Sequence, residues 1–277
     1  MSHPNLVKGA AHSRLIVFDS DLESLAFMAS LLHVENLTKR FGQIEAVRGV
    51  TLDVAAGEVV GFLGPNGAGK TTTMRMITGF LEPTEGQVTL GGFSLDGEPI
   101  QARSSFGYLP EGAPAYPDMS VLEYLQFIGQ VRGLAGSVLH ERIATVISQV
   151  HLERVEQQTI ETLSKGFKRR VGIAQAILHD PPILIMDEPT DGLDPNQKHE
   201  VRQLIRSMGS TKAIVLSTHI LEEVEAVCTR VILIAAGRIV FDGRPQEFEA
   251  RAPASVQHNR MDHVFREMTG GGAEVRS

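Results

Sequence analysis

A glycine-rich segment, Gly64-Pro-Asn-Gly-Ala-Gly-Lys-Thr71, carries the strongest chemical signal in the sequence. Glycines let consecutive backbone N–H groups turn toward one anion, and the helix that starts near Lys70 adds its positive end. This spacing between an apolar strand and a helix is the P-loop pattern and predicts a nucleotide site rather than an ordinary turn. Lys70 would neutralise the β- and γ-phosphates, and the Thr71 hydroxyl would bind Mg²⁺. The residues expected to contact nucleotide are Gly64, Pro65, Asn66, Gly67, Ala68, Gly69, Lys70, Thr71 and Thr72.

Two acids follow a second apolar strand, at Asp187 and Glu188. A metal–phosphate site needs such a pair: Asp187 would hold Mg²⁺ directly or through water, and Glu188 would polarise the attacking water as general base. Acids after a strand can also simply cap the next helix. Together with the P-loop, however, the pair predicts nucleotide hydrolysis.

Strand-like and helical segments alternate along the chain in a pattern that would position these residues. Such alternation predicts an α/β fold whose parallel sheet is covered on both faces. An all-helical insert is expected between Pro110 and Leu163, beginning at a capping box of Ser120 and Glu123. Strands are predicted over residues 33–42, 49–54, 58–63, 87–92, 106–110, 182–187, 213–218 and 231–241.

The composition is that of a soluble globular protein. The 277 residues are 42% hydrophobic and 21% charged, with a net charge of -7 that disfavours a generic nucleic-acid binder. Cys228 is the single cysteine, so an intramolecular disulfide is excluded and a reducing cytosol is expected. The most apolar leader-like stretch, residues 15–34, is interrupted by acids. We therefore expect neither a membrane span nor a secretory leader.

Three further motifs complete the pattern: 163–167 (LSKGF) between the two sites, then 192–195 (GLDP) and 217–219 (STH). In this order the sequence resembles the nucleotide-binding subunit of ATP-binding cassette (ABC) transporters over about residues 33–245. The resemblance implies an ATPase that uses ATP and Mg²⁺. It also implies a P-loop NTPase fold with a mixed, mainly parallel core sheet, an antiparallel N-terminal β subdomain and an all-helical insert carrying the signature motif.

The resemblance also implies a dimer and the roles of several residues. Two copies would associate head to tail, each ATP lying between one P-loop and the partner's signature helix, which would contribute Ser164 and Gly166. Asp194 would lie at the dimer seam. His219 would contact the γ-phosphate and help to hold Glu188 and the water.

The sequence departs from the family pattern at several of these positions. Phe41 stands where a tyrosine more often stacks on adenine; packing of this ring in a turn is the alternative. Glu111 replaces a glutamine and could still reach Mg²⁺ or its water, while adding negative charge. Lys165 and Phe167 replace a glycine and a glutamine of the signature. Lys165 either adds a cation near the partner's nucleotide or faces solvent.

The YLPE and LSKGF motifs, with the tail DHVFREMT, are similar to exporter-type cassettes of the multidrug and gliding-motility group. This likeness implies a separate membrane-spanning permease and a location on the cytoplasmic face of the membrane. The permease would dock in a groove beside the helical insert. The candidate lining residues are aromatic or apolar: Tyr108, Tyr116, Leu122, Tyr124 and Phe127. The alternative is that these side chains belong to the core. The alternative, a soluble ABC ATPase acting on DNA or ribosomes, is disfavoured by the short insert and the single P-loop.

These patterns divide the chain into three parts. Residues 1–32 are expected to be an N-terminal extension, 33–245 the ABC nucleotide-binding domain with a helical subdomain at about 111–166, and 246–277 a C-terminal helix and flexible tail. Since the segment from Met28 resembles a complete cassette start, a misassigned start is one hypothesis for residues 1–27.

Overall fold

The computed structural model describes residues 30–112 and 115–270. The hypothesis about residues 1–27 and the expected flexible end of the tail, residues 271–277, lie outside the described residues.

A six-stranded sheet of order β10-β9-β3-β8-β7-β6 forms the centre of the molecule. Five strands run parallel and β10 pairs antiparallel with β9, which confirms the mixed, mainly parallel sheet. Strands buried on both faces form near-continuous apolar runs, and every residue of β3, β6, β7 and β8 is buried. The strands are β3 (Val59–Leu63), β6 (Phe106–Leu109), β7 (Ile183–Asp187), β8 (Ala213–Thr218), β9 (Arg230–Ala235) and β10 (Arg238–Gly243).

The last two of these strands correct a prediction. Residues 231–241 form a hairpin rather than one strand, because the chain reverses at Ala236 and Gly237. Both residues have positive φ, 46° and 78°, as the tight turn between antiparallel strands requires. Gly237, followed by Arg238, is the turn signal inside this run, and the strand prediction passed over it.

A second, antiparallel sheet of order β2-β1-β4-β5 confirms the N-terminal β subdomain. It contains β1 (Ser30–Phe41), β2 (Ile44–Ala55), β4 (Glu85–Leu90) and β5 (Phe93–Ser94). Strand β1 begins three residues before the expected His33, because Leu32 pairs with Val54 and Leu90 and is fully buried.

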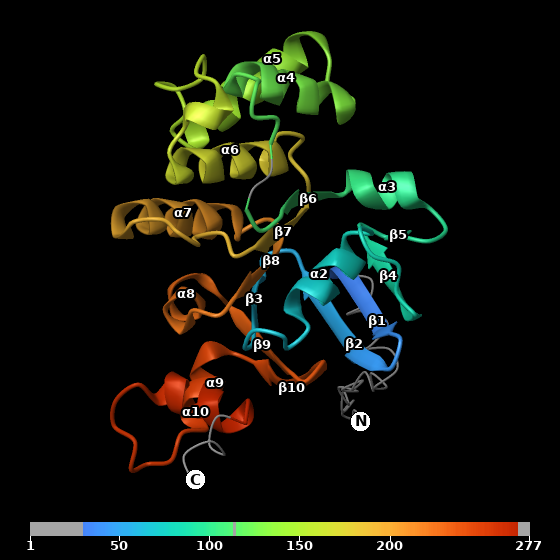
Figure 1. Cartoon of the computed structure of the whole chain (residues 1–277), viewed down its shortest axis with the longest axis vertical. Helices are drawn as coiled ribbons and strands as arrows, with labels where there is room; N and C mark the ends of the chain where they lie inside the picture. Colours follow the sequence, from blue (N-terminus) through green and yellow to red (C-terminus); the bar gives the residue numbers. More distant parts are fainter. Residues whose placement is uncertain (1–29, 113–114, 271–277) are drawn as a thin grey trace, which may run out of the picture.

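The alternation of side chains along β7 links the core sheet to helices on both faces. Ile183 and Ile185 pack in one cluster with α2 (Lys70–Ile77) and the small sheet. Leu184 and Met186 face the opposite cluster, with α6 (Lys165–Ile177) and α7 (Pro195–Met208). Figure 1 shows α2 between the two sheets and α6 and α7 on the far side of the core sheet. The P-loop helix and the signature helix therefore lie on opposite faces.

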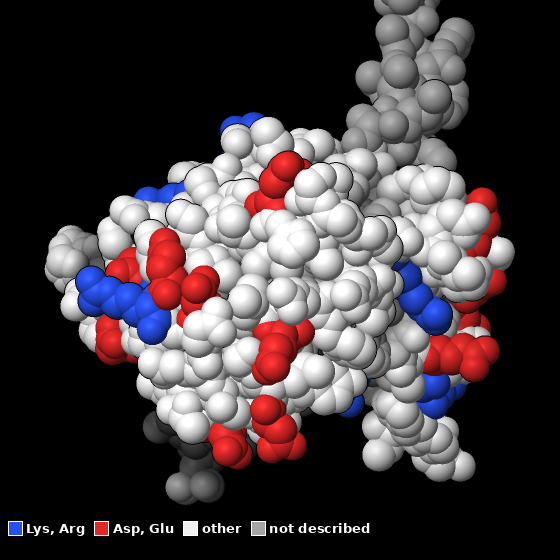
Figure 2. Space-filling view, turned by 90° about the horizontal axis from the view of Figure 1, so that it is seen from above, with Lys and Arg blue, Asp and Glu red and all other residues white. Residues whose placement is uncertain are grey.

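The helical insert forms one end of the molecule (Figure 1). It contains α4 (Val121–Val131), α5 (Gly136–Gln149) and the 3₁₀ turn η1 (Ile160–Thr162), followed by α6. The predicted capping box is present: the Glu123 backbone N–H donates to Ser120 Oγ at 3.2 Å, and the Ser120 backbone N–H donates to Glu123 Oε2 at 2.8 Å. Seen from this end, acidic side chains are scattered over a mostly uncharged surface without a broad basic patch (Figure 2).

The remaining helices are short. Helix α3 (Pro99–Ser104) precedes β6, and α8 (Leu221–Val227) follows β8. Helices α9 (Pro245–Ala250) and α10 (Arg260–Met268) pack around Phe248 against β9 and β10, at the opposite end from the insert. Among the described residues, no helix is both long enough and apolar enough to span a bilayer.

Candidate nucleotide-binding site

The glycine-rich segment connects β3 to α2 and has the close backbone approaches that its sequence predicts. A Cβ atom on Gly64 would lie 2.5 Å from the carbonyl oxygen of Ile234, so only glycine fits there. Gly69 has φ of 108°, a conformation that favours glycine, and stands immediately before the first residue of α2. The loop is therefore shaped by backbone geometry, with its N–H groups leading into a helix N-terminus.

Lys70, the first residue of α2, is 7% exposed and points back into this loop. Its Nζ donates to the carbonyls of Gly64 at 2.6 Å and Pro65 at 3.2 Å. Burial lowers the pKa of Lys70, and the negative charges of Glu188, Asp187 and Glu111 oppose that shift. Three acids from two different segments thus act on one ammonium, and the structure brings together four residues that the sequence predicted for this site.

Asp187, the last residue of β7, is 2% exposed and pairs in register with Ser217 on β8. The Ser217 hydroxyl donates to Asp187 Oδ1. Asp187 Oδ2 is buried and has no hydrogen-bond partner among the described residues. A buried, unpartnered carboxylate oxygen suits a hard cation such as Mg²⁺, which keeps waters and phosphate oxygens as its other ligands. Thr71, the other predicted ligand, is the second residue of α2. The described residues hold no cluster of three or more His, Cys, Asp or Glu that could bind a metal by themselves.

Glu188 and His219 follow the ends of the neighbouring strands β7 and β8. His219 Nδ1 lies 2.9 Å from the Glu188 carboxylate. Glu188 has φ of 51°, which is uncommon for a residue other than glycine. The Glu188 backbone N–H donates to the Ser217 carbonyl at 3.1 Å, so β8 fixes the position of the acid as well as that of the histidine.

Arg169 is a residue of the site that the sequence analysis missed. It is 5% exposed and donates to four backbone carbonyls, those of Pro110, Asp187, Glu188 and Pro189. Burial lowers the pKa of its guanidinium, and the nearby carboxylates oppose that shift. Helical periodicity contains a signal that could have found it: Gly166, Arg169 and Ile173 share one buried face of α6, so the middle cation of the run 168–170 lies inside.

The signature segment begins α6. Ser164 is the N-cap, and its hydroxyl accepts from the Phe167 N–H at 3.4 Å. Gly166 packs against α7, where a Cβ would lie 2.5 Å from the Gln197 side chain. Lys165 Nζ lies 3.0 Å from Asp191 Oδ2. The Lys165 side chain is 65% exposed, as the solvent-facing alternative predicts, and it also pairs with this acid of its own chain.

Asp194 has a local role that the sequence analysis did not identify. Its carboxylate accepts from the backbone N–H groups of Asn196 and Gln197, at 3.0 and 2.9 Å, and caps α7. Within the described part of the chain, no hydrogen bond joins Ser164, Gly166 or Asp194 to the P-loop of the same copy. These three residues do not complete the site within one copy.

Phe41 ends β1 with its ring 49% exposed, and Lys39 Nζ lies 5.4 Å from the ring centroid. The exposure argues against the turn-packing alternative. An open aromatic face of this kind is suited to stacking on a base.

The fold and the site together define a P-loop nucleotide hydrolase with a helical insert. The family model described as "ABC transporter" matches residues 47–191. The chain is 38% identical over 218 residues to a Nod factor export ATP-binding protein I of Ralstonia nicotianae, covering 78% of this chain and 68% of that protein. It is 35% identical to the linearmycin resistance ATP-binding protein LnrL of Bacillus subtilis, over 80% of this chain and 71% of that protein.

Solved structures agree with this assignment. An ATP-binding subunit of an ABC transporter superposes with a TM-score of 0.79 at 31% identity, covering 87% of this chain and all of that one. A bacterial ABC transporter cassette solved as a dimer superposes with a TM-score of 0.71 at 26% identity, covering 77% and 98%. The chain belongs to the ABC transporter family. It is an ATP-binding subunit with ATPase activity.

Proposed function

We propose that this chain binds Mg·ATP, hydrolyses it within a head-to-tail dimer, and so drives export by a separate membrane-spanning permease. The observation that carries the proposal is that residues at or after the ends of three neighbouring strands, β3, β7 and β8, come together at the P-loop. They are Lys70 of the P-loop itself, the acids Asp187 and Glu188, and His219. Among the relatives, the chain from Ralstonia nicotianae is named for export, which supports the direction of transport.

In the hydrolysis step, the P-loop N–H groups and Lys70 hold the phosphates. Thr71 and Asp187 would hold Mg²⁺, which would neutralise phosphate charge. Glu188 accepts a proton from a water molecule while the oxygen of that water attacks the γ-phosphorus. The bond between the γ-phosphorus and the ADP oxygen then breaks. His219 holds the Glu188 carboxylate and contacts the γ-phosphate. Glu111, whose charge acts on Lys70, would contact Mg²⁺ or its water.

A second copy completes the site in this proposal. Ser164 and the Gly166 backbone stand at the start of the 13-residue helix α6, whose positive end favours a phosphate oxygen of the partner's ATP. Asp194 is exposed at the start of α7 beside them and lies at the seam. Phe41 stacks on adenine. The dimeric state of a solved relative supports this arrangement.

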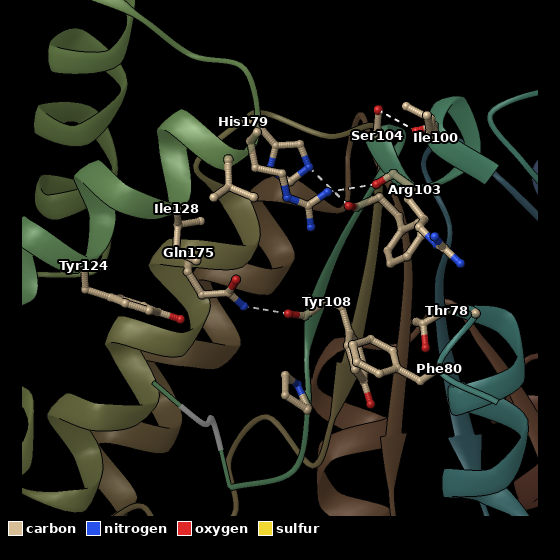
Figure 3. Close-up of a pocket in the computed structure, with 15 residues that line it drawn as sticks. Thr78, Phe80, Ile100, Arg103, Ser104, Tyr108, Tyr124, Ile128, Gln175 and His179 are labelled. Atoms are coloured by element: carbon tan, nitrogen blue, oxygen red, sulfur yellow. Dashed lines mark hydrogen bonds between the residues drawn. The ribbon is translucent and has the colours of Figure 1, made fainter. Parts of the chain in front are cut away.

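The permease docks in a cavity of about 680 Å³ between the helical insert and α2 and α3. In Figure 3 the insert side carries Tyr124, Ile128 and Gln175, and the opposite side carries Phe80 and Ile100. Two of its apolar side chains are strongly exposed, Phe80 at 74% and Ile100 at 77%. A hollow of this size, lined mainly by apolar side chains with Arg103 and Arg132 among them, suits a short helix of a membrane subunit, and docking there places the chain on the cytoplasmic face of the membrane.

The aromatic residues named from the sequence divide between the cavity and its surroundings. Tyr108 and Tyr124 line the cavity and are also buried in the core, so both of the earlier alternatives describe them. Tyr116 and Phe127 lie outside the lining and contact each other edge to face, with ring centroids 5.5 Å apart. Leu122 packs on the core of the insert.

The Glu188→Gln variant tests this function. We expect ATP affinity to be retained, turnover to fall at least about a hundredfold, and an ATP-dependent dimer to accumulate, because a neutral amide cannot accept the proton. ATP binding, phosphate release and light scattering would measure the three effects. Glu153→Gln, a change at an exposed glutamate outside the site, is the matched control. Normal turnover by Glu188→Gln would refute the general-base assignment, and co-purification with ribosomes or DNA instead of a membrane protein would favour the alternative function.

A further inference from the structure

Glu188 has a backbone conformation that needs support. At φ 51° the side chain of a glutamate clashes with its own backbone in a way that glycine avoids. Neighbouring groups must therefore hold Glu188 in this conformation. Its N–H donates to Ser217, and its carbonyl accepts from the Asp191 N–H at 3.1 Å. These two hydrogen bonds do not involve the carbonyl groups of the adjoining residues, Asp187 and Pro189, which another donor must hold.

That donor is Arg169. Its guanidinium bonds the carbonyls of three consecutive residues, Asp187, Glu188 and Pro189, through Nε and Nη2. Its Nη1 donates to Pro110 at 3.1 Å, in the segment that leads to Glu111. A planar group with five N–H donors can span these carbonyls, whereas an ammonium concentrates three donors at one point.

The position of Arg169 on α6 also connects the signature helix to the end of β7. It lies five residues after Ser164, the N-cap of the signature helix, and its side chain crosses to the end of β7. Three of the acids that act on it, with Asp191 first and Asp187 and Glu188 next, come from the end of β7 and the residues after it, and the fourth, Glu111, follows β6. Arg169 therefore ties the signature helix to the backbone of the general base within one copy.

We propose that Arg169 is a positioning residue for ATP hydrolysis: it holds the backbone of Glu188 in the left-handed conformation that directs the carboxylate toward His219. The inference rests on the proposed role of Glu188 as general base. Arg169 acts through main-chain carbonyls, and none of its hydrogen bonds in the described part of the chain reaches the Glu188 carboxylate.

The test compares Arg169→Met and Arg169→Lys with the parent chain. We expect Arg169→Met to lower kcat about tenfold or more, and Arg169→Lys about threefold or more, while KM and the affinity for ATP change less than about twofold, because misplacing a reacting group affects the rate more than binding. Arg170→Lys is the matched control. It changes the next residue of the same helix, which contacts Glu200, the Val150 carbonyl and the ring of Phe167. Because lysine keeps the positive charge at these contacts, we expect its kcat to stay within about twofold.

A second readout separates positioning from a general structural role. In the Glu188→Gln background, adding Arg169→Met should leave the ATP-dependent dimer intact by light scattering, since the amide that replaces the carboxylate no longer needs to be directed. Wild-type kcat in both Arg169 variants would overturn the proposal, and so would equal losses of kcat, ATP affinity and dimer formation. If Arg169→Met does not fold, Arg169→Lys decides alone by the same split between kcat and affinity. Normal turnover by Glu188→Gln would instead reject the proposed function itself.

Discussion

The imidazole Nδ1 of His219 lies 2.9 Å from the carboxylate of Glu188, and the two residues follow the ends of adjacent parallel strands, β7 and β8. Parallel strands bring their carboxyl ends to one edge of a sheet, so the two side chains meet although they are 31 positions apart in the sequence, with all of α7 between them. With its proton on Nδ1, the ring donates to the carboxylate and restricts its rotation. His219 thus orients the group proposed to accept the proton from water.

Replacing His219 by alanine should reduce turnover while leaving ATP bound. We expect kcat to fall about tenfold to a hundredfold and ATP affinity to change little, because the carboxylate loses its orienting partner while the P-loop is untouched. Steady-state phosphate release and equilibrium ATP binding measure the two quantities. His140→Ala removes an exposed histidine whose ring nitrogen Nδ1 lies 2.8 Å from the Gly136 carbonyl oxygen on α5, so it serves as the control. A raised KM with unchanged kcat would make His219 a binding residue rather than an orienting one.

The residues of this site differ in how far the sequence could predict them. Lys70, Asp187 and His219 follow apolar strands, and their fixed spacing leaves little freedom of placement. Arg169 was missed because a cation in the run 168–170 suggests a solvated face. Its burial depends on carbonyls from Pro110 and from residues 187–189, which only the folded chain brings together.

The contacts of Lys165 and the cap at Asp194 show the same limit. The partner of Lys165 is Asp191, an acid 26 residues away whose approach follows from the packing of α6 beside the end of β7. The sequence G-L-D-P contained a cap signal, an acid followed by proline, but the family resemblance directed attention to the dimer seam. A residue can serve both roles, and the local one follows from elementary helix capping.

If the permease docks in the cavity between the helical insert and α3, a charge placed there should prevent association. Ile100, 77% exposed on α3, is the test position. We expect Ile100→Glu to abolish co-purification of a membrane protein, because an apolar partner surface cannot solvate the carboxylate. The melting temperature should stay within about 2 °C, as surface substitutions rarely change stability.

Ile44→Glu provides the control for this experiment. Ile44 is 70% exposed, but it starts β2 in the other sheet, away from the cavity lining. Both variants introduce the same charge at a similar exposure, so a difference between them reports the place of docking. Equal recovery of the membrane protein with Ile100→Glu and with the unchanged chain would contradict docking in this cavity.

His179, which lines the same cavity, makes the stability of the chain depend on pH. Its Nε2 lies 3.1 Å from the Phe106 carbonyl oxygen, and its Nδ1 is buried without a partner in the described part of the chain (Figure 3). Burial, reinforced by the charges of Arg132, Lys212 and Arg142, lowers the pKa of His179 from 6.5 to about 4. The folded chain therefore keeps this imidazole neutral at pH values where the unfolded chain protonates it.

Between pH 6.5 and about 4, the unfolded state binds more protons at His179 than the folded state, so the free energy of unfolding must fall as the pH falls. We expect His179 to contribute about 1–3 kcal/mol to that decrease in the free energy of unfolding; the contribution vanishes as the pH rises well above 6.5. His179→Gln keeps a donor for the Phe106 carbonyl but cannot titrate. Urea unfolding of both chains at about pH 7 and about pH 5 measures the effect: the difference between them should shift in favour of the variant at the lower pH. A difference that does not change between the two pH values would show that His179 titrates alike in the folded and unfolded states.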